Sequence, residues 1–396
     1  MKDLLLSSDF YPMIGGAHHW LYNVYSRWPS PVTVFAGSQL TNNDTDAIEQ
    51  QRAFDAGDHG SLLLRRIELW FPDINIFNFA FWRRLIAAVR LISAETGRSQ
   101  ATLHCLRAFP DGILGLAWKA LAPRRRQIVT FAHGEEISIA WSSRQLKILS
   151  YWVYKASALV ITNSLNTEAL VHSLSPSAKT AVIHPGVTLI DFAFPTEELE
   201  HGRAVYGFAH DDVVLVTVGR MEVRKNHANV LKAMRRLLDS GLQLKYLIVG
   251  GGGEEQTLRA LVKNLQLEQA VRFTGFLPDQ GRSLAMALAD IHIMPSIHHG
   301  QMFEGFGIVF IEAAAAGIPS IAGNTGGQTE AVLHGKTGLV IDGTKVDAIV
   351  GAIKQLAENS GLRREMGDAG RQWAAAHEWQ SVAVKIFQEI GRATGK

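Results

Sequence analysis

Two glutamates, Glu304 and Glu312, stand eight positions apart in a segment that is otherwise glycine-rich and apolar. Gly305 and Gly307 follow the first glutamate, and glycine lets a backbone approach a ligand closely. An apolar helix that includes residues 313–316 follows, and the N–H groups at its start would point at an anion. Glu304 could accept hydrogen bonds from sugar hydroxyls, and Glu312 could accept them from a ribose. At this spacing, the two carboxylates are better placed to bind two parts of one extended ligand than to lie on either side of one glycosidic bond. The spacing does not exclude a pair that acts as acid and nucleophile.

Two cations, Arg220 and Lys225, share the loop that follows the apolar run 213–218. Open α/β sheets bind ligands at the carboxyl ends of their strands, so this loop is expected at a ligand-binding edge. Paired cations there suit a diphosphate whose negative charge grows as it leaves. The alternative is a surface loop with ordinary basic residues, and the position at a strand end favours the diphosphate site.

Three other loops after predicted strands contain candidate residues. His133 follows the run 127–132 and precedes a glycine, and this position favours a site role at least as strongly as a structural one. Gly15 and Gly16 follow the first strand and open a helix, where backbone N–H groups meet phosphates in doubly wound folds. They do not form a GxGxxG fingerprint, so a dinucleotide site is disfavoured and a plain tight turn stays open. The glycine run 250–253 is interpreted as a turn, because the two glutamates after it would repel a phosphate.

No metal site is predicted. The histidine pairs 18–19 and 298–299 consist of adjacent residues, whose side chains rarely bind one ion together. With a single cysteine, Cys105, the chain has neither a disulfide framework nor a cysteine-based zinc site. We therefore expect no cofactor beyond the substrates.

The elements that must position these residues follow an alternating pattern of short apolar runs and longer helical segments. Runs such as 213–218 are apolar throughout, which is typical of parallel strands covered on both faces. The predicted strands are 3–8, 31–36, 62–69, 101–106, 127–132, 158–163 and 179–183, then 213–218, 245–250, 270–274, 291–295, 318–322 and 338–341. This pattern predicts an α/β fold of two Rossmann-like, doubly wound domains, 1–187 and 188–374, with a C-terminal helix at about 375–396.

Composition argues against several classes of protein. The 396 residues carry a formal net charge of +2, which argues against a protein that coats nucleic acid. No run reaches the roughly 18 apolar residues of a membrane span, and the short apolar N-terminus is broken by Asp9, so no signal peptide is predicted. A reducing, cytoplasmic location is expected, with peripheral contact at the inner face of a membrane left open.

Aromatic and basic residues gather in two places. The segment 70–92 is rich in Trp, Phe and Ile and ends in a helical pattern with Arg83 and Arg84, and residues 124–126 are three consecutive arginines. We interpret the aromatic segment as a core-packing helix, with an interfacial or acceptor-facing surface as the alternative. The arginines are interpreted as a solvated loop, with an anionic partner left open.

Taken together, these motifs resemble the retaining glycosyltransferases of GT-B architecture, family 4. The segment EGFGIVFIEAAAAGIPSIAGNTGGQTEAV resembles the E-x7-E element of that family, and GRMEVRKN, LIVGGGGEE, VRFTGFLPD and ADIHIMPS resemble its second-domain blocks in order. SSDFYPMIGGAHHW and TFAHGEE resemble first-domain blocks, so the resemblance spans nearly the whole chain. Within the family, the sequence resembles in texture the bacterial α-mannosyltransferases of phosphatidylinositol mannoside synthesis. One departure is Gly281–Arg282, where members often differ.

The resemblance implies a role for each motif. Arg220 and Lys225 would hold the diphosphate, Glu304 would contact the donor sugar, and Glu312 would bind the ribose. The backbone of Gly305, Phe306, Gly307, Ile308 and Val309 would line the sugar and phosphate, and Phe276 and Leu277 would lie beside the base. Gly15 and Gly16 would face the donor phosphate, and His133 the sugar, across an interdomain cleft. The final helix would cross back onto the first domain.

The implied reaction moves a hexose from GDP-mannose or a UDP-sugar to a glycan, lipid-linked or small-molecule acceptor, with retention and without a metal ion. We expect no covalent intermediate on Glu304 or Glu135. Basic and aromatic residues near 65–92 and 124–126 suit an anionic or lipid-linked acceptor, and a soluble sugar or glycan stays open. The alternatives are a GT-B nucleotide-sugar epimerase and a non-catalytic nucleotide-sugar-binding protein; the sequence predicts neither the acceptor nor the oligomeric state.

Overall fold

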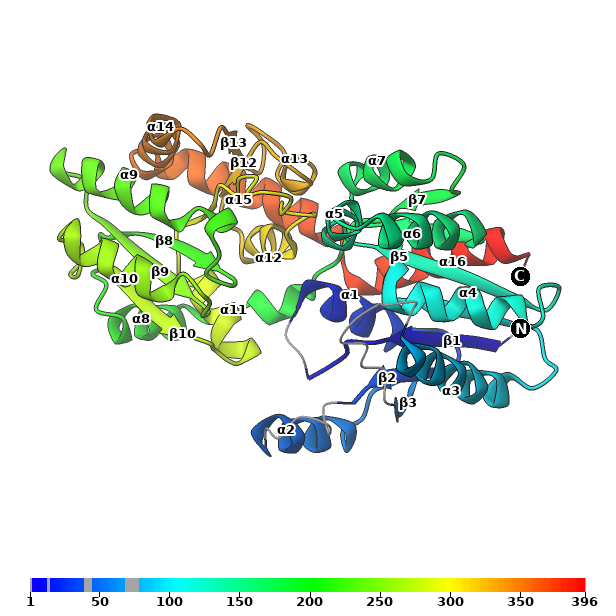
Figure 1. The fold of residues 1–396 in the computed structure, drawn as a ribbon. Coiled ribbons are helices and arrows are strands. Elements are labelled where there is room, and N and C mark those ends of the chain that lie inside the picture. Colours follow the sequence, from blue (N-terminus) through cyan, green and yellow to red (C-terminus); the bar gives the residue numbers. More distant parts are fainter. Residues whose placement is uncertain (1, 13–14, 39–44, 68–77, 396) are drawn as a thin grey trace. The chain divides into compact units, whose positions relative to one another are not determined.

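The chain divides into two compact units (Figure 1). The computed structural model describes residues 2–12, 15–38, 45–67 and 78–395. Unit 1 consists of Met1–Pro185 with Trp379–Lys396, and unit 2 of Gly186–Glu378. The division therefore lies two residues before the boundary that the sequence predicts, and the chain rejoins unit 1 at Trp379 rather than at about residue 375.

Within the described residues, unit 1 contains a seven-stranded sheet whose strands all run parallel. Its order is β3 (Leu62–Ile67), β2 (Val32–Gly37), β1 (Lys2–Ser7), β4 (Ala101–Cys105), β5 (Arg126–Ala132), β6 (Leu159–Thr162) and β7 (Thr180–Val182). Each strand occupies a run that the sequence predicts. The order reverses between β1 and β4, so the loops after these two strands flank the switch point where doubly wound sheets bind ligands.

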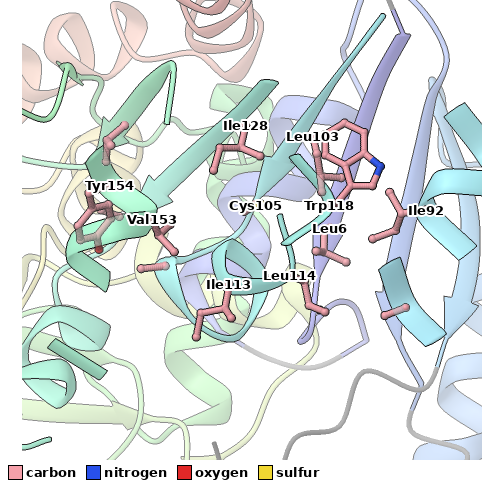
Figure 2. Close-up of a cluster of buried hydrophobic side chains, with 14 of the residues drawn as sticks. Leu6, Ile92, Leu103, Cys105, Ile113, Leu114, Trp118, Ile128, Val153 and Tyr154 are labelled. Atoms are coloured by element: carbon pink, nitrogen blue, oxygen red, sulfur yellow. The ribbon is translucent and has the colours of Figure 1, made fainter. Parts of the chain in front are cut away.

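Helices cover both faces of this sheet. The connecting helices are α1 (Gly16–Tyr25), α2 (Thr45–Asp55), α3 (Phe79–Thr96), α4 (Ile113–Ala120), α5 (Glu135–Trp141), α6 (Arg144–Ala156) and α7 (Leu165–Leu174), with a π-turn at Ala108–Gly112 before α4. Leu4 and Leu6 belong to the core under α3, α4 and α6, whereas Leu5 belongs to the core on the other face. Figure 2 shows Leu6, Leu103, Trp118 and Ile128 converging in the first of these cores. A strand buried on both faces explains the uninterrupted apolar runs.

The C-terminal helix α16 (Trp379–Thr394) completes the second core of unit 1. Its buried residues Val382, Ile386 and Ile390 follow the spacing of one helix face. They pack with Trp20 and Leu21 of α1. The predicted return of the final helix onto the first domain is therefore observed.

Unit 2 contains a six-stranded parallel sheet within the described residues. Its order is β10 (Val271–Gly275), β9 (Leu244–Val249), β8 (Val213–Val218), β11 (Ile291–Met294), β12 (Ser320–Gly323) and β13 (Gly338–Ile341). Its helices are α8 (Thr196–Val205), α9 (His227–Asp239), α10 (Glu255–Asn264), α11 (Asp279–Ala287), α12 (Ile308–Ala316), α13 (Gln328–Ala331), α14 (Val346–Ala357) and α15 (Ser360–Ala375), with 3₁₀ turns at Leu189–Phe192 and Val223–Lys225. Here the switch point lies between β8 and β11.

The aromatic segment is only partly a core element. Phe81 is buried, as the core interpretation requires, but Phe79 is 81% exposed and Trp82 is 46% exposed. The interpretation is therefore wrong for Phe79 and Trp82, because the face of α3 that meets the sheet is made by Phe81 and Leu85 with their helical neighbours. The earlier aromatics, at 70–77, lie outside the described residues.

Among the described residues, no helix is both long enough and apolar enough to cross a membrane.

Candidate active site

The loops after β8 and β11 meet at the switch point of unit 2 through a buried ion-pair network. Glu304 Oε2 accepts hydrogen bonds from Lys225 Nζ at 2.6 Å and from Arg224 Nη1 at 2.9 Å. Burial alone would raise the pKa of the Glu304 carboxyl, but Lys225 and Arg224 hold it below its ordinary value. Glu304 is therefore an ionised carboxylate held between two cations in a site that is largely closed to water.

Arg220 lies apart from this pair. Its side chain is 58% exposed and forms an ion pair with Glu222 Oε1 at 3.1 Å. Glu222 Oε2 also pairs with Arg224 Nε at 2.8 Å, so Glu222 links the exposed arginine to the buried one. Lys225 pairs with Glu304, whereas Arg220 is linked to Glu304 through Glu222 and Arg224. The structure therefore does not bring Arg220 and Lys225 together as the sequence predicts.

The sequence did not single out Arg224 or Glu222. Side chains of adjacent residues in a fully extended loop would point in opposite directions. Instead, the 3₁₀ turn at Val223–Lys225 brings both cations onto one carboxylate. The signal that could have found Arg224 is the run of two cations directly before Asn226, which has a left-handed backbone with φ 66° and immediately precedes α9.

A close-packed glycine turn holds Glu304 at the start of α12. Gly307 has φ 86°, and a Cβ there would lie 2.6 Å from the Phe310 ring. A Cβ on Gly327 would lie 2.1 Å from the carbonyl oxygen of Gly305, and Gly327 N donates a hydrogen bond to Glu304 O at 2.9 Å. The N-cap position of α12 is Gly307, which has no side chain that could cap the helix. The start of α12 thus retains the helix-end N–H groups that bind anions in other proteins.

The other predicted residues of the turn divide between core and surface. The Phe306 ring is buried in the core of unit 2, so only its backbone is available to a ligand, whereas Gly305, Ile308 and Val309 are partly buried. The predicted lining of a sugar by this backbone remains a prediction.

Glu312 points from α12 toward Arg282 of α11. Its Oε1 accepts a hydrogen bond from Arg282 Nη1 at 2.7 Å, while its buried Oε2 accepts none from any described residue. Arg282, noted in the sequence as a departure from the family, is therefore the partner that orients Glu312. One carboxylate oxygen remains for another donor such as a hydroxyl group.

Phe276 lies beside the glycine run that follows β9. The Phe276 side chain is 65% exposed, and a Cβ on Gly251 would lie 2.7 Å from its ring. A Cβ on Gly252, where φ is 156°, would lie 2.5 Å from Met221 O, in the loop that also contains Arg220. The glycine run therefore packs the ends of β8, β9 and β10 closely together, while Leu277 packs against the core. An exposed aromatic ring at this edge offers a flat apolar surface.

Unit 1 has a separate polar cluster at the carboxyl ends of β1, β4 and β5. His133 Nε2 lies 2.9 Å from Leu106 O, which can only accept, so Nε2 carries the proton and Nδ1 is an acceptor. Burial, with Arg107 nearby, lowers the pKa of His133 to about 3, so the imidazole is neutral near pH 7. His18 Nδ1 donates to Asp9 O at 3.0 Å, and Arg107 Nη2 binds Asp9 Oδ2 at 2.6 Å.

The predicted glycines belong to this cluster. Gly15 precedes α1, which begins at Gly16 without a side-chain cap, and a Cβ on Gly15 would lie 2.9 Å from the His18 ring. Asp111 is fully buried, accepts a hydrogen bond from Ser8 N at 2.7 Å, and has its pKa raised by burial to about 7. The sequence had indicated neither this carboxyl nor Arg107, because the loops that hold them come from strands that are distant along the chain.

Within the described residues, no cluster of three or more His, Cys, Asp or Glu could hold a metal ion.

Comparison with known proteins gives the family of the chain. Residues 14–190 match the model of Glycosyltransferase Family 4, and residues 200–373 match that of Glycosyl transferases group 1. The chain is 34% identical over 289 residues to a GDP-mannose-dependent α-(1-6)-phosphatidylinositol monomannoside mannosyltransferase of Mycolicibacterium smegmatis, covering 71% of this chain and 74% of the relative. A GDP-mannose-dependent monoacylated α-(1-6)-phosphatidylinositol monomannoside mannosyltransferase of Corynebacterium glutamicum is 27% identical, over 97% of this chain and 96% of the relative.

Solved structures show the same fold. HepE of Anabaena in complex with UDP superposes with a TM-score of 0.81 at 18% identity, over 99% of this chain and 100% of that one. Sucrose-phosphate synthase of Thermosynechococcus elongatus superposes with a TM-score of 0.78 at 21% identity over the whole of both chains. With its two Rossmann-like units and these matches, the chain belongs to the group 1 glycosyltransferases of family 4.

Proposed function

We propose that this hexosyltransferase moves a hexose from a nucleotide-diphosphate sugar to an acceptor hydroxyl, with retention of configuration and without a metal ion. The observation that carries the proposal is the charge arrangement at the carboxyl ends of β8 and β11. Lys225 and Arg224 are buried on the Glu304 carboxylate, beside an uncapped helix N-terminus and the exposed Arg220. Fixed cations and helix-end N–H groups are the protein groups that stabilise a departing diphosphate.

The Lys225–Glu304 pair is the contact that the donor changes. A diphosphate at this edge competes with Glu304 for Lys225, and Glu304 then accepts hydrogen bonds from sugar hydroxyls. The exposed Arg220 guanidinium can rotate onto the same diphosphate, because its pair with Glu222 lies at the surface. In the transfer, the acceptor oxygen bonds to the anomeric carbon on the face that the diphosphate leaves. The hydroxyl proton passes to the departing phosphate oxygen, so no carboxylate bonds covalently to the sugar.

Three further residues orient the substrates in this proposal. The free Oε2 of Glu312 accepts a hydrogen bond from the ribose, while Arg282 holds Oε1. The exposed Phe276 ring contacts the base. In unit 1, the unprotonated Nδ1 of His133 accepts a hydrogen bond from a sugar hydroxyl. The roles of Gly15 and Gly16 toward the donor phosphate remain predictions from the family.

The donor is GDP-mannose or a UDP-sugar. The mannosyltransferase relatives are named as GDP-mannose-dependent, and the HepE structure holds UDP. The acceptor in this proposal is a glycan or lipid-linked sugar, and the enzyme works in the cytoplasm with peripheral contact at the inner face of the membrane.

A thermal-shift comparison of GDP, UDP, GDP-mannose and UDP-glucose in EDTA tests donor binding, because a ligand that binds only the native state raises Tm. NMR of the anomeric proton of the first product then gives the stereochemistry. We expect either GDP and GDP-mannose or UDP and UDP-glucose to raise Tm in EDTA. The product should retain the anomeric configuration of the donor. No shift with any nucleotide, an inverted product, or turnover that stops in EDTA would contradict the proposal. Conversion of the donor alone into a new sugar nucleotide would identify an epimerase instead.

A further inference from the structure

One helical layer of unit 1 presents an outer surface that the site does not use. Helix α4 packs against both α3 and α6, and all three contribute to the core under one face of the sheet (Figure 1). Large apolar side chains on the opposite, solvent side of this layer are strongly exposed. They are Trp82 and Ile86 of α3 at 46% each, Leu121 after α4 at 67%, and Trp141, Ile148 and Trp152 of α5 and α6 at 42%, 49% and 50%. We call this surface the basic–aromatic face.

Helix α6 is the centre of the face. Its residues Arg144, Lys147, Ile148, Tyr151, Trp152 and Lys155 fall within an arc of about 140° at 3.6 residues per turn. The side chains of Ser150, Val153 and Tyr154 are buried on the inner side of the same helix. The outer arc therefore combines three cations with two aromatic rings and Ile148.

The cations lie against the rings. Lys147 Nζ lies 3.7 Å from the centroid of the Trp141 ring, and Lys155 Nζ lies 5.0 Å from that of Trp152. These contacts join α5 to α6 and place the positive charges at the same level as the aromatic surface. Such amphipathic side chains combine an apolar body with a polar end, which suits the boundary between hydrocarbon and water.

Acidic side chains are few in the helices that build the face: α3 has Glu95 near its end, and α5 begins with Glu135, which is exposed, and the buried Glu136. The stretches 78–94, 112–134 and 137–167 contain no Asp or Glu. Their exposed cations are Arg83 and Arg90 of α3, Arg124 and Arg125 after α4, and Arg144, Lys147 and Lys155 of α6. A chain with a net charge of only +2 thus concentrates positive charge on one apolar surface.

We propose that the basic–aromatic face, centred on α6, docks unit 1 onto an anionic lipid bilayer. The proposal deepens the peripheral membrane contact of the proposed function and assigns it to defined residues. A lipid surface fits better than a protein partner, because exposed cations around rings match a plane of negative headgroups over apolar chains. Docking would also serve a lipid-linked acceptor, since α5 begins two residues after His133 and ends at Trp141.

Vesicle flotation with the full chain tests this assignment. We expect binding to vesicles of phosphatidylcholine with phosphatidylglycerol, little binding to pure phosphatidylcholine, and release when salt rises from about 0.1 to 1 M, which shortens the Debye length from about 10 to 3 Å. The variant K147E/K155E should bind at least about tenfold more weakly, and I148S/W152S should bind more weakly even at low salt. The matched control is V384S/K385E on the exposed side of α16, whose core lies on the other face of the sheet.

The outcomes separate the alternatives. Equal binding by the α6 variants and the control, or equal binding to neutral and anionic vesicles, would overturn the proposal. A dimer in sedimentation velocity that the α6 variants abolish would show that the face holds a second copy of the chain instead. The Tm shift produced by GDP or UDP should be the same in all variants, which also shows that they are folded. A chain that shows the Tm shift with GDP or UDP but does not bind vesicles would contradict the docking surface and leave the transferase proposal unaffected. A chain that binds vesicles but shows no Tm shift with either nucleotide would contradict the transferase proposal and leave the docking surface unaffected.

Discussion

Removing the negative charge of Glu304 should destabilise unit 2, because two buried cations depend on it. In Glu304→Gln the side chain keeps its shape, but Arg224 and Lys225 lose their shared carboxylate at 2.9 and 2.6 Å. Breaking a buried ion pair by removing one partner costs about 3–5 kcal/mol. These cations lie at the end of a loop and Glu222 still contacts Arg224, so we expect the lower end, about 3 kcal/mol.

The expected change is large enough to measure. For a domain of 150–250 residues, about 1 kcal/mol shifts Tm by about 2–4 °C, so the unit 2 transition should fall by about 6–12 °C in differential scanning calorimetry. Adding Lys225→Met to Glu304→Gln removes one of the two cations that lose the Glu304 carboxylate. The double variant should therefore be less destabilised than the sum of the single variants, with a coupling of about 0.5–3 kcal/mol.

Arg220→Met is the matched control on the same loop. The Arg220 side chain is 58% exposed and pairs only at the surface with Glu222, so its loss should cost at most about 1 kcal/mol of stability. If Arg220 stabilises the leaving diphosphate, its removal should instead lower kcat about 10²–10³-fold, as the loss of one oxyanion donor does. An unchanged Tm in Glu304→Gln would refute the reasoning about the buried network. An unchanged kcat in Arg220→Met would refute the diphosphate role.

Three further predictions follow from the structure. Gly327→Ala should lower both Tm and kcat, because its Cβ would lie 2.1 Å from a backbone carbonyl oxygen of the glycine turn; Gly253→Ala, where nothing lies within 4 Å, should change neither. Phe276→Ala should raise the KM for the donor about tenfold, as loss of base stacking does, and leave kcat unchanged in steady-state assays; a higher KM accompanied by a lower Tm would point to a structural role. Burial lowers the pKa of His292 to about 3. The unfolded chain therefore binds a proton below pH 6.5 that the folded chain does not, and stability falls on acidification, by about 2 kcal/mol at pH 5. His292→Gln should flatten this loss in urea titrations at pH 7 and pH 5, whereas His210→Gln, at a side chain that is 94% exposed, should not.

The sequence by itself determined the architecture. Runs such as Val213–Val218 are apolar at every position, and only a strand covered on both faces can bury all of them. The alternation of such runs with helices then requires parallel sheets, and each predicted run forms a strand in the structure. The placing of Lys225 after a strand and of Glu304 before a helix follows from the same local pattern, because it depends only on where an element begins or ends.

Tertiary structure decided which side chains meet. The turn at Val223–Lys225 directs Arg224 and not Arg220 to Glu304, which is 80 residues further along the chain. Arg282 reaches Glu312 across two helices, and Asp9, Arg107 and His133 gather from three separate strand ends. On α3, the contact with the sheet rather than the aromatic content decided that Phe81 is buried and Trp82 exposed. Burial periodicity is a local property that a sequence displays, whereas the direction of a loop side chain depends on backbone angles and on neighbours that only the folded chain brings together.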